Sequence, residues 1–283
     1  MSRIVIALMW LLHFFPDRVV ARTGEAAGAV LFWLIPERRR VTRMNIDRCF
    51  PHLSAQERER LSRATFRAFC RSFAERGILW WAPRERVERL VRIEGLEHAA
   101  GERVIIFAPH FVGLDAMISR LSMERSLACM YSKVKDAFVD RVLLEGRSRF
   151  GCRMFPRLNA VRRALHEIRS GTAFYYLPDL DYGPKHSVFV PFFGMQAATV
   201  TALSYIARAT RAKVVPCVTR MLPQGGYVSR LFPAWEGFPS GDKEQDARRM
   251  MAFVEEHVRE MPEQYHWLHR RFKTRPPGEA RFY

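Results

Sequence analysis

The chain has 283 residues, enough for one large α/β domain or two small ones, and its 48% hydrophobic content excludes general disorder. Basic side chains outnumber acidic ones by 46 to 29, and the net charge of +17 indicates a polyanionic partner: nucleic acid, an anionic membrane surface or a phosphorylated substrate. The five cysteines are odd in number and lack C-x-x-C spacing, which is typical of buried thiols and predicts neither a disulfide framework nor a metal site.

The first 36 residues form a hydrophobic segment. Its two apolar runs, residues 4–15 and 26–35, are each shorter than the roughly 20 residues of a membrane-spanning helix. Together they are long enough for a tilted span or for a hairpin lying in one leaflet. No small-residue cleavage site follows the first run, so we expect no removed signal peptide. Because the arginine-rich segment 37–48 comes next, we predict a membrane anchor over residues 1–36, with a helix pair buried in a soluble core as the alternative.

The remainder, residues 37–283, contains no linker long enough to separate two domains. A long helix is predicted over residues 54–81, because Ser54 and Glu57 form a capping-box pattern and apolar residues follow at steps of three and four. Alternating strand and helix patterns then indicate an α/β fold. Strands are predicted at 91–93, 104–107, 172–177, 188–190 and 213–219, and helices at 117–123, 137–150, 162–168 and 196–210.

The segment RVIIFAPHFVGLDAMI, residues 103–118, contains the strongest candidate for a catalytic site. Four apolar residues, 104–107, are typical of an interior strand covered on both faces, and His110 and Asp115 follow. A histidine beside a carboxylate is a suitable general base, because the carboxylate fixes the imidazole tautomer. Continuous helix would rotate the two side chains about 140° apart. We therefore predict a strand-turn-helix corner, with Gly113 permitting the turn.

A second polar segment, PDLDYGPKHSVFVPFFG, follows the predicted strand 172–177. It contains two carboxylates, Asp179 and Asp181, beside glycine and proline residues that favour turns. Phe192 and Phe193 at its end either line an apolar channel or pack in the core, and core packing is the commoner use of such aromatics.

Four blocks together resemble the bacterial lipid A late acyltransferases, a branch of the lysophospholipid acyltransferase superfamily. These blocks are APHFVGLD (108–115), LPDLDYGPKHSVFVPFFG (177–194), QAATVTALSYIARATRAKVVPCVTR (196–220) and PEQYHWLHRRFKTRP (262–276). The resemblance implies a mixed central sheet flanked by helices, as in glycerolipid acyltransferases. It also implies a location on the cytoplasmic face of the cell inner membrane, acyl carrier protein as acyl donor, a phosphorylated glycolipid as acceptor, and no cofactor or metal.

The resemblance also implies roles for individual residues. His110 is similar to the general base of the family and Asp115 to its charge-relay partner, a position where some members have glutamate. Arg149 best matches an arginine that precedes the aspartate loop, and Asp181 matches the second aspartate of that loop. Asp179 is a weaker candidate. A structural salt bridge for Asp181 is as plausible as contact with substrate.

The glycerophosphate branch of the superfamily carries an E-G-T-R-S block that binds the acceptor phosphate, and this chain lacks it. The similar fragment LEGRSRFG, 144–151, lies before the aspartate loop and does not correspond to that block. This departure favours a larger phosphorylated glycolipid acceptor. Three alternatives remain: an acyltransferase for another membrane glycolipid or lysophospholipid; a lipid hydrolase, despite the absence of a G-x-S-x-G motif; and a nucleic-acid-binding protein, despite the absence of a recognisable binding motif.

Overall fold

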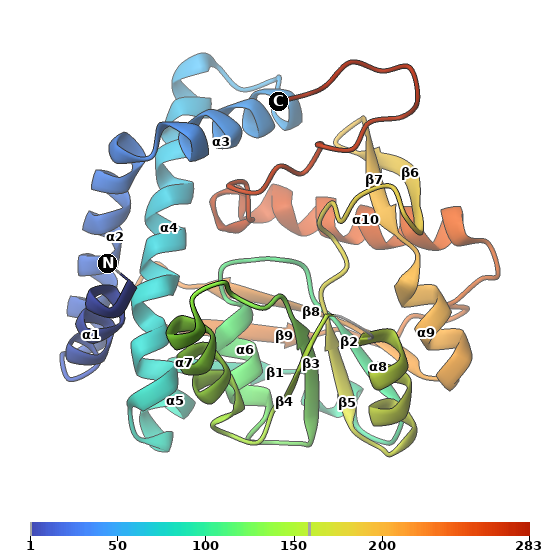
Figure 1. Cartoon of the computed structure of the whole chain (residues 1–283), viewed down its shortest axis with the longest axis horizontal. Helices are drawn as coiled ribbons and strands as arrows, with labels where there is room; N and C mark the ends of the chain where they lie inside the picture. The colour runs from blue at the N-terminus through green and yellow to red at the C-terminus, as the bar shows by residue number, and fades with distance from the viewer. Residues whose placement is uncertain (1, 158–159) are drawn as a thin grey trace.

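The computed structural model describes residues 2–157 and 160–283. Its centre is a seven-stranded mixed sheet in the order β1-β9-β8-β2-β5-β3-β4, flanked by helices, which confirms the fold class expected from the sequence (Figure 1). Five neighbouring strands from β8 to β4 are parallel, and β9 and β1 run in the opposite direction. The strands are β1 (Val91–Glu94), β2 (Val104–Phe107), β3 (Leu127–Tyr131), β4 (Arg153–Pro156), β5 (Ala173–Tyr176), β8 (Lys213–Met221) and β9 (Tyr227–Leu231).

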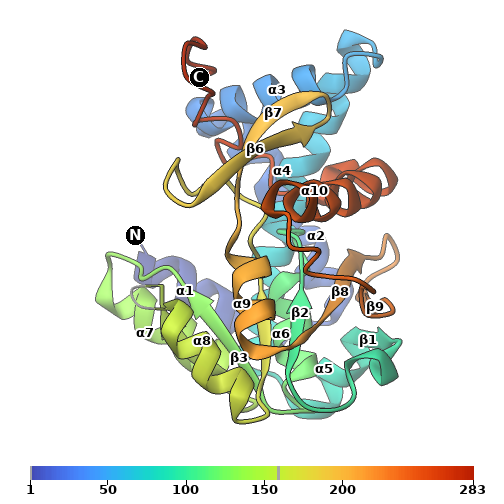
Figure 2. The ribbon, with the colours of Figure 1, turned by 90° about the vertical axis from the view of Figure 1, so that its right-hand side faces the viewer.

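The helices surround this sheet, and a separate hairpin of β6 (Ser187–Phe192) and β7 (Met195–Val200) lies above helix α10 in Figure 2. The α-helices are α1 (Ser2–Leu12), α2 (Asp17–Leu34), α3 (Pro36–Cys49), α4 (Ala55–Trp81), α5 (Arg84–Leu90), α6 (Leu114–Leu121), α7 (Ala137–Ser148), α8 (Ala160–Arg169), α9 (Ala202–Thr210) and α10 (Lys243–Glu260). Short 3₁₀ helices occupy Leu96–Ala99 and Pro262–Gln264. The capping box of Ser54 and Glu57 starts α4 as predicted.

Strand β2 is buried on both faces, as its sequence predicts. Ile105 and Phe107 pack in a cluster with residues of α8, α9 and α10, whereas Val104 and Ile106 pack on the other side with residues of α6. Alternate side chains of a strand point to opposite faces, so each face of β2 needs its own covering helices. The end of β2 is therefore fixed from both sides, which makes it a rigid support for the residues that follow.

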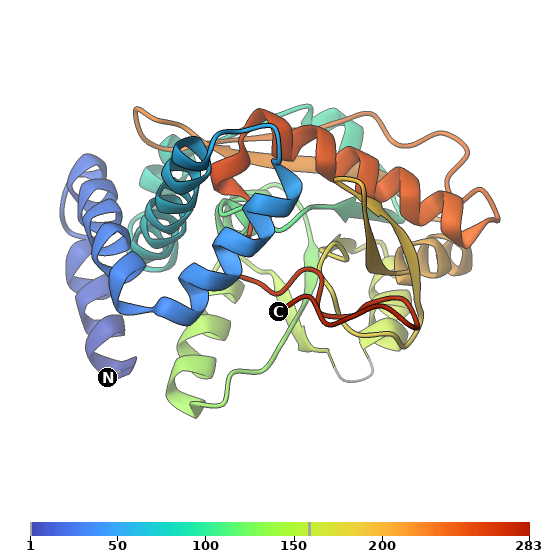
Figure 3. The same cartoon turned by 90° about the horizontal axis from the view of Figure 1, so that it is seen from above.

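The N-terminal helices pack against α4 through glycine. A Cβ atom on Gly24 would lie 2.6 Å from the Arg71 Cα, and one on Gly28 would lie 2.5 Å from the Phe66 carbonyl oxygen. Figures 1 and 3 show α2 running alongside α4. Within the described residues, no individual helix has the length and apolar character of a membrane span, although α2 and α3, bent by 96° where they meet, pass that test as a pair.

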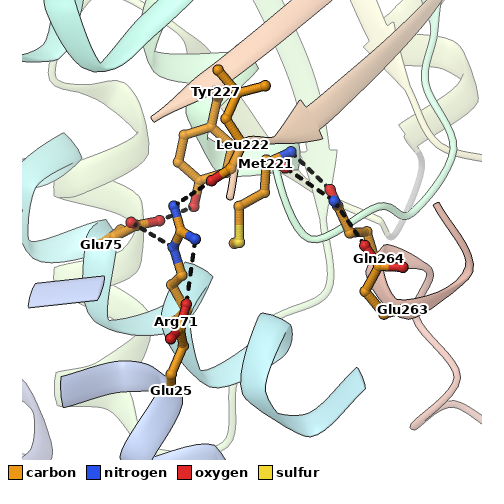
Figure 4. Close-up of polar contacts among 8 residues, drawn as sticks. All are labelled: Glu25, Arg71, Glu75, Met221, Leu222, Tyr227, Glu263 and Gln264. Carbon is orange, nitrogen blue, oxygen red and sulfur yellow. Dashed lines mark hydrogen bonds and ion pairs between the residues drawn. The ribbon is translucent and has the colours of Figure 1, made fainter. Parts of the chain in front are cut away.

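A buried polar network joins these helices to the sheet (Figure 4). The Arg71 guanidinium donates to Glu75 at 3.0 Å, to Glu25 at 3.4 Å and to the Leu222 carbonyl at 3.0 Å, and the Tyr227 hydroxyl donates to Glu75. Arg71 is therefore buried, although it lies in a helix rich in exposed arginines. Its charge is offset by the two carboxylates, which makes burial of the guanidinium tolerable.

The same figure shows how the C-terminal segment begins. The Gln264 side chain accepts from the Met221 N–H at 2.7 Å and donates to its carbonyl at 3.0 Å, so the amide pairs with β8 as a backbone unit would. Beyond Gln264 the chain passes the loop that follows β2 and reaches α3, where the Asn45 amide donates to the carbonyl oxygens of Trp267 and His269. The last residues are thereby held at the carboxyl edge of the sheet.

Some predicted elements were wrong. The helix predicted over 196–210 is strand β7 followed by α9. Phe193 and Gly194 both have positive φ, 50° and 75°, which suits a two-residue hairpin turn and pairs β7 with β6. The pattern analysis also missed β3, β4, β9 and α10. The corner at Gly113 exists, but the glycine has φ −80°; it is needed because a Cβ there would lie 2.5 Å from the Thr219 methyl carbon.

Candidate active site

His110 is held by the carboxylate of Asp179. The His110 Nδ1 lies 2.6 Å from Asp179 Oδ1, and the His110 backbone N–H donates to Asp179 Oδ2 at 2.9 Å. The Tyr265 hydroxyl donates to the same Oδ2 at 3.1 Å. Asp179 is fully buried, which raises its pKa, but the adjoining His110 outweighs burial and the pKa is lowered overall. An ionised Asp179 fixes the Nδ1–H tautomer, which leaves Nε2 as a proton acceptor.

The sheet brings these two residues together. Phe107 and Tyr176 are register partners at the ends of the parallel strands β2 and β5. His110 lies three residues after Phe107, and Asp179 lies three residues after Tyr176. Parallel neighbours end at the same edge of a sheet, and in open α/β sheets that edge is the usual place for a site. The pairing therefore follows from strand order and register, although the two residues are far apart in sequence.

The expected pairing of His110 with Asp115 is not what the structure shows. Asp115 lies in the first turn of α6 and is buried between two arginines, with Arg147 Nε 2.5 Å from Oδ1 and Arg76 Nε 2.6 Å from Oδ2. Burial raises the pKa of Asp115, but the two guanidinium groups outweigh it and lower the pKa to about 2. The turn after β2 therefore separates the histidine from the carboxylate, and Asp115 serves as counter-ion to the two arginines.

The arginine placed beside His110 is Arg147 rather than Arg149. Arg147 and His110 line the same cavity. The Arg149 side chain instead donates to the Leu79 carbonyl at 3.4 Å and lies over the Phe150 ring. A two-residue difference near the end of α7 turns the side chain to another side of the helix. The expected region of the chain therefore does reach the cavity, but through Arg147, while the Arg149 side chain contacts Leu79 and Phe150.

Asp181 ties the aspartate loop to the C-terminal segment. Its carboxylate accepts from the Thr274 N–H at 2.7 Å, from the Thr274 hydroxyl at 2.8 Å and from the Gly183 N–H at 2.9 Å. Asp181 is fully buried. Its partners are thus backbone and hydroxyl groups, and neither the arginine contact nor the substrate contact considered from the sequence is needed to explain its burial.

A cavity of about 400 Å³ opens beside His110. Its wall includes apolar side chains of α6, β3, β5 and α8, among them Leu114, Ile118 and Tyr176. The charged or titratable groups among its described lining residues, the tyrosines and cysteine aside, are all basic: His110, Arg147, Arg157, Lys185 and His186. An elongated apolar group and an anionic group could therefore bind side by side.

The two phenylalanines proposed for an apolar channel lie elsewhere. Phe192 is fully buried and packs with Tyr265, Trp267 and Phe272, and Phe193 packs on Phe50. Both contribute to the core, the commoner use weighed from the sequence.

Comparison with known proteins identifies the family. The family model described as bacterial lipid A biosynthesis acyltransferase matches residues 1–274. The chain belongs to this family. It is 33% identical to the lipid A biosynthesis lauroyltransferase of Escherichia coli K12, over 96% of this chain and 91% of that protein. It is 34% identical to the lipid A biosynthesis myristoyltransferase of the same strain, over 95% and 84%, and 30% identical to its palmitoleoyltransferase, over 98% and 92%.

Among solved structures, the 1-acyl-sn-glycerophosphate acyltransferase PlsC from Thermotoga maritima aligns over 86% of this chain and 98% of that chain, with a TM-score of 0.41 and 16% identity. The family match makes this protein a lipid A biosynthesis acyltransferase, as the four sequence blocks indicate. Within the described residues, no group of three or more histidine, cysteine and acidic side chains could hold a metal ion.

Sequence reasoning missed Tyr265, Arg76 and the choice of Arg147. Tyr265 lies in the distinctive block 262–276, whose resemblance to the family does not by itself indicate a role for the tyrosine. Arg147 lies inside LEGRSRFG, a fragment set aside because of its position. Arg76 follows the buried Glu75 in a helix rich in arginine. Arg76 pairs with Asp115 in the first turn of α6, and the sequence around Arg76 does not indicate this contact because it depends on how α4 packs against α6.

Proposed function

We propose that this lipid A acyltransferase moves a fatty acyl chain from an acyl carrier protein thioester to a hydroxyl group of an acylated, phosphorylated glycolipid, with His110 as general base. The observation that carries the proposal is the His110–Asp179 pair at the edge of the cavity. The imidazole is 18% exposed and its Nδ1 is already occupied, so Nε2 is the nitrogen available to a bound hydroxyl. A general base of this kind accelerates a reaction by about 10²- to 10⁴-fold.

The proposed reaction has one transfer and no acyl-enzyme intermediate. The acceptor oxygen attacks the thioester carbonyl carbon while His110 Nε2 takes its proton. The carbon–sulfur bond then breaks, and the imidazolium returns the proton to the departing thiolate. Asp179 stabilises the positive imidazole between these steps, as the aspartate of a serine hydrolase triad does.

Negative charge develops on the carbonyl oxygen during the attack, and Arg147 is the proposed donor to it. The Arg147 side chain is 15% exposed, lines the cavity with His110, and is kept in place by Asp115. A preorganised charged donor in a site with little water gives strong transition-state stabilisation. Asp115 would then act on the reaction through Arg147.

The experiment incubates the purified protein with acyl carrier protein charged with lauroyl, myristoyl or palmitoleoyl groups and with the tetra-acylated lipid A precursor. Mass spectrometry of the lipid then measures the gain of one acyl group. We expect a gain for the wild type and for His166→Ala, a surface histidine control, and almost none for His110→Ala. A full gain with His110→Ala would overturn the proposed base. Acylation of a lysophospholipid or release of free fatty acid in place of the gain would favour another acceptor or hydrolysis.

The N-terminal helices are proposed to lie in one leaflet, on the cytoplasmic face of the inner membrane. Nearly all exposed large apolar side chains of the described residues belong to the segment 4–35, including Trp10, Phe14, Phe15 and Trp33. Glycine packing holds α2 on α4, which favours a hairpin that remains attached to residues 37–283 over a span that leaves them.

A vesicle flotation assay tests this placement. The protein should float with vesicles containing anionic lipid, and Trp10→Ser/Trp33→Ser should float less, while Trp235→Ser, which changes a partly buried tryptophan packed against the core, should not lose binding. Extraction of the wild type from vesicles by alkaline carbonate would agree with a hairpin in one leaflet. Full resistance to extraction would favour a span.

A further inference from the structure

Arg271 is a buried cation whose role is unexplained by its direct contacts. It is fully buried, and its Nη atoms donate to the Ala198 carbonyl at 3.1 Å and approach the Thr199 hydroxyl at 3.4 Å and the Met251 sulfur at 3.5 Å. Its Nε has no hydrogen-bond partner among the described residues, and no carboxylate there forms an ion pair with it. A buried guanidinium without a counter-charge is costly, so a nearby negative charge should compensate it.

Arg271 lies near Tyr265, because both contact the Phe192 ring: the Arg271 guanidinium carbon is 5.3 Å from the centre of that ring, and the Tyr265 ring centre is 5.9 Å from it. Burial raises the pKa of Asp179, His110 lowers it, and Arg271 lowers it further by a smaller amount. Burial also raises the pKa of Tyr265, and Arg271 lowers it. Tyr265 contacts Asp179 directly, because its hydroxyl donates to Asp179 Oδ2 at 3.1 Å. The carboxylate therefore accepts from both His110 and Tyr265, and the Arg271 charge lies near the tyrosine. All these groups are in a weakly polar interior, where charges interact beyond contact distance.

We propose that Tyr265 and Arg271 are positioning residues for the base: the tyrosine hydroxyl and the arginine charge keep the Asp179 carboxylate ionised and aligned with His110 Nδ1. This proposal rests on the proposed role of His110. Tyr265 and Arg271 do not touch the cavity, and they act on the reaction through Asp179. The C-terminal segment thereby sets the proton affinity of a base that lies more than 150 residues earlier in the chain.

The direction of the effect follows from charge. A hydrogen-bond donor and a cation both disfavour protonation of the His110–Asp179 pair, so removal of either raises the pH at which the pair takes up a proton. The other groups facing the pair are Tyr176 and Tyr182 from β5 and its loop, Arg157 beside Tyr182, Lys185 and His186 from the same loop, His266 and His269 from the C-terminal segment, Arg38 from α3 and Arg147 from α7.

The two histidines of the C-terminal segment cannot produce the expected pH change. Burial, with His110 and other cations, lowers the pKa of His266 to about 3 and that of His269 to about 4. Both are neutral through the pH range in which the enzyme would be assayed. The tyrosines of this set have raised pKa values because they are buried, so they also stay neutral. Because His186 also lines the cavity, the acid limb is assigned to the His110–Asp179 pair by its shift in the position 265 variants, since Tyr265 donates to Asp179.

The test measures kcat against pH for the full-length enzyme with the acyl carrier protein donor and the lipid A precursor. Tyr265→Phe and Arg271→Gln should each move the acid limb upward by about one pH unit, with kcat largely restored above the new limb. Arg271→Lys retains the charge and should keep the limb near its wild-type position. A loss of kcat at every pH, with an unmoved limb, would mean a merely structural role and would overturn the proposal.

Tyr227→Phe is a matched control. Tyr227 is also buried and its hydroxyl also donates to a buried carboxylate, that of Glu75 (Figure 4), but among the described residues neither member of this pair bonds to His110 or Asp179. Its loss should reduce thermal stability and leave the acid limb in place. An equal limb shift in both tyrosine variants would contradict the specific role of Tyr265.

A second substitution covers the case in which Tyr265→Phe or Arg271→Gln folds poorly. Placing 3-fluorotyrosine at position 265 adds one small atom and strengthens the hydroxyl as a donor, so the acid limb should move downward. An upward shift or no shift would overturn the proposal. The two hypotheses remain separable: activity in His110→Ala refutes the proposed base, whereas an inactive His110→Ala with unmoved limbs in the position 265 variants refutes only the positioning role.

Discussion

Replacing Asp179 with asparagine tests the site most directly. The carboxylate accepts three hydrogen bonds, from the His110 ring at 2.6 Å, the His110 N–H at 2.9 Å and the Tyr265 hydroxyl at 3.1 Å. An asparagine has one acceptor oxygen in place of two. If that oxygen faces the backbone N–H and the Tyr265 hydroxyl, it satisfies two donors and turns the amide NH₂ toward His110 Nδ1. The imidazole must then carry its proton on Nε2, where it cannot act as a base.

We expect Asp179→Asn to lower kcat by about 10³- to 10⁴-fold, the scale of loss when an orienting aspartate beside a catalytic histidine becomes asparagine. The thermal unfolding temperature should fall much less, because the substitution is isosteric and two of the three donors keep a partner. The assay is acyl transfer with saturating donor and acceptor, followed by mass spectrometry. Circular dichroism melting of the same preparations separates catalytic loss from unfolding.

Asp115→Asn is the informative comparison, because the sequence alone assigns Asp115 the role that the structure gives to Asp179. In the structure the buried Asp115 neutralises two largely buried arginines, and loss of one partner of a buried ion pair costs about 3–5 kcal/mol. Its first effect should therefore be on stability. If Asp115→Asn kept its melting temperature but lost activity, while Asp179→Asn remained active, the pairing described here would be refuted.

Three further predictions concern packing and pH. Gly113→Ala should destabilise the protein by about 1–3 kcal/mol in urea titrations, since its Cβ would lie 2.5 Å from the Thr219 methyl carbon, and adding Thr219→Ser should recover part of the loss. Gly28→Ala should loosen α2 from α4, because the nearest obstacle is the Phe66 carbonyl oxygen of the backbone, and limited proteolysis should then cleave the N-terminal helices sooner. The pKa of Asp115 falls from 3.8 to about 2 on folding, so about 2 kcal/mol of stability, present above pH 4, should be lost as the pH falls toward 2 in the wild type and not in Asp115→Asn.

The fold class, the capping of α4 and the corner after β2 could be predicted because each depends on residues near one another in sequence. Strand β2 is a run of four apolar residues, and Ser54 with Glu57 is a local capping pattern. The helix expected over 196–210 failed for a related reason: the positive φ of Phe193 is not a preference of phenylalanine, so the hairpin turn gave little signal.

The partner of His110 could not be predicted by spacing. Asp115 is near in sequence and suited the expectation, whereas Asp179 becomes a neighbour only when β5 pairs with β2 in parallel. Once that register is known, the equal distance of His110 and Asp179 from the last paired residues makes their meeting nearly unavoidable. Predicting this partner requires the order of the strands in the sheet, and the local pattern of apolar and polar residues does not contain that order.

The position of the C-terminal segment explains why a site built at the ends of β2 and β5 needs a third element. Loops at a sheet edge have few fixed contacts of their own, yet a base must keep its geometry to within a fraction of an ångström. The segment after α10 supplies those contacts: the His266 N–H donates to the His110 carbonyl at 3.1 Å, Tyr265 binds Asp179, and Thr274 binds Asp181. It joins both loops to each other as well as to the rest of the molecule. The geometry of the His110–Asp179 pair is thus determined by tertiary contacts from the C-terminal segment as much as by the two strands that the histidine and the aspartate follow.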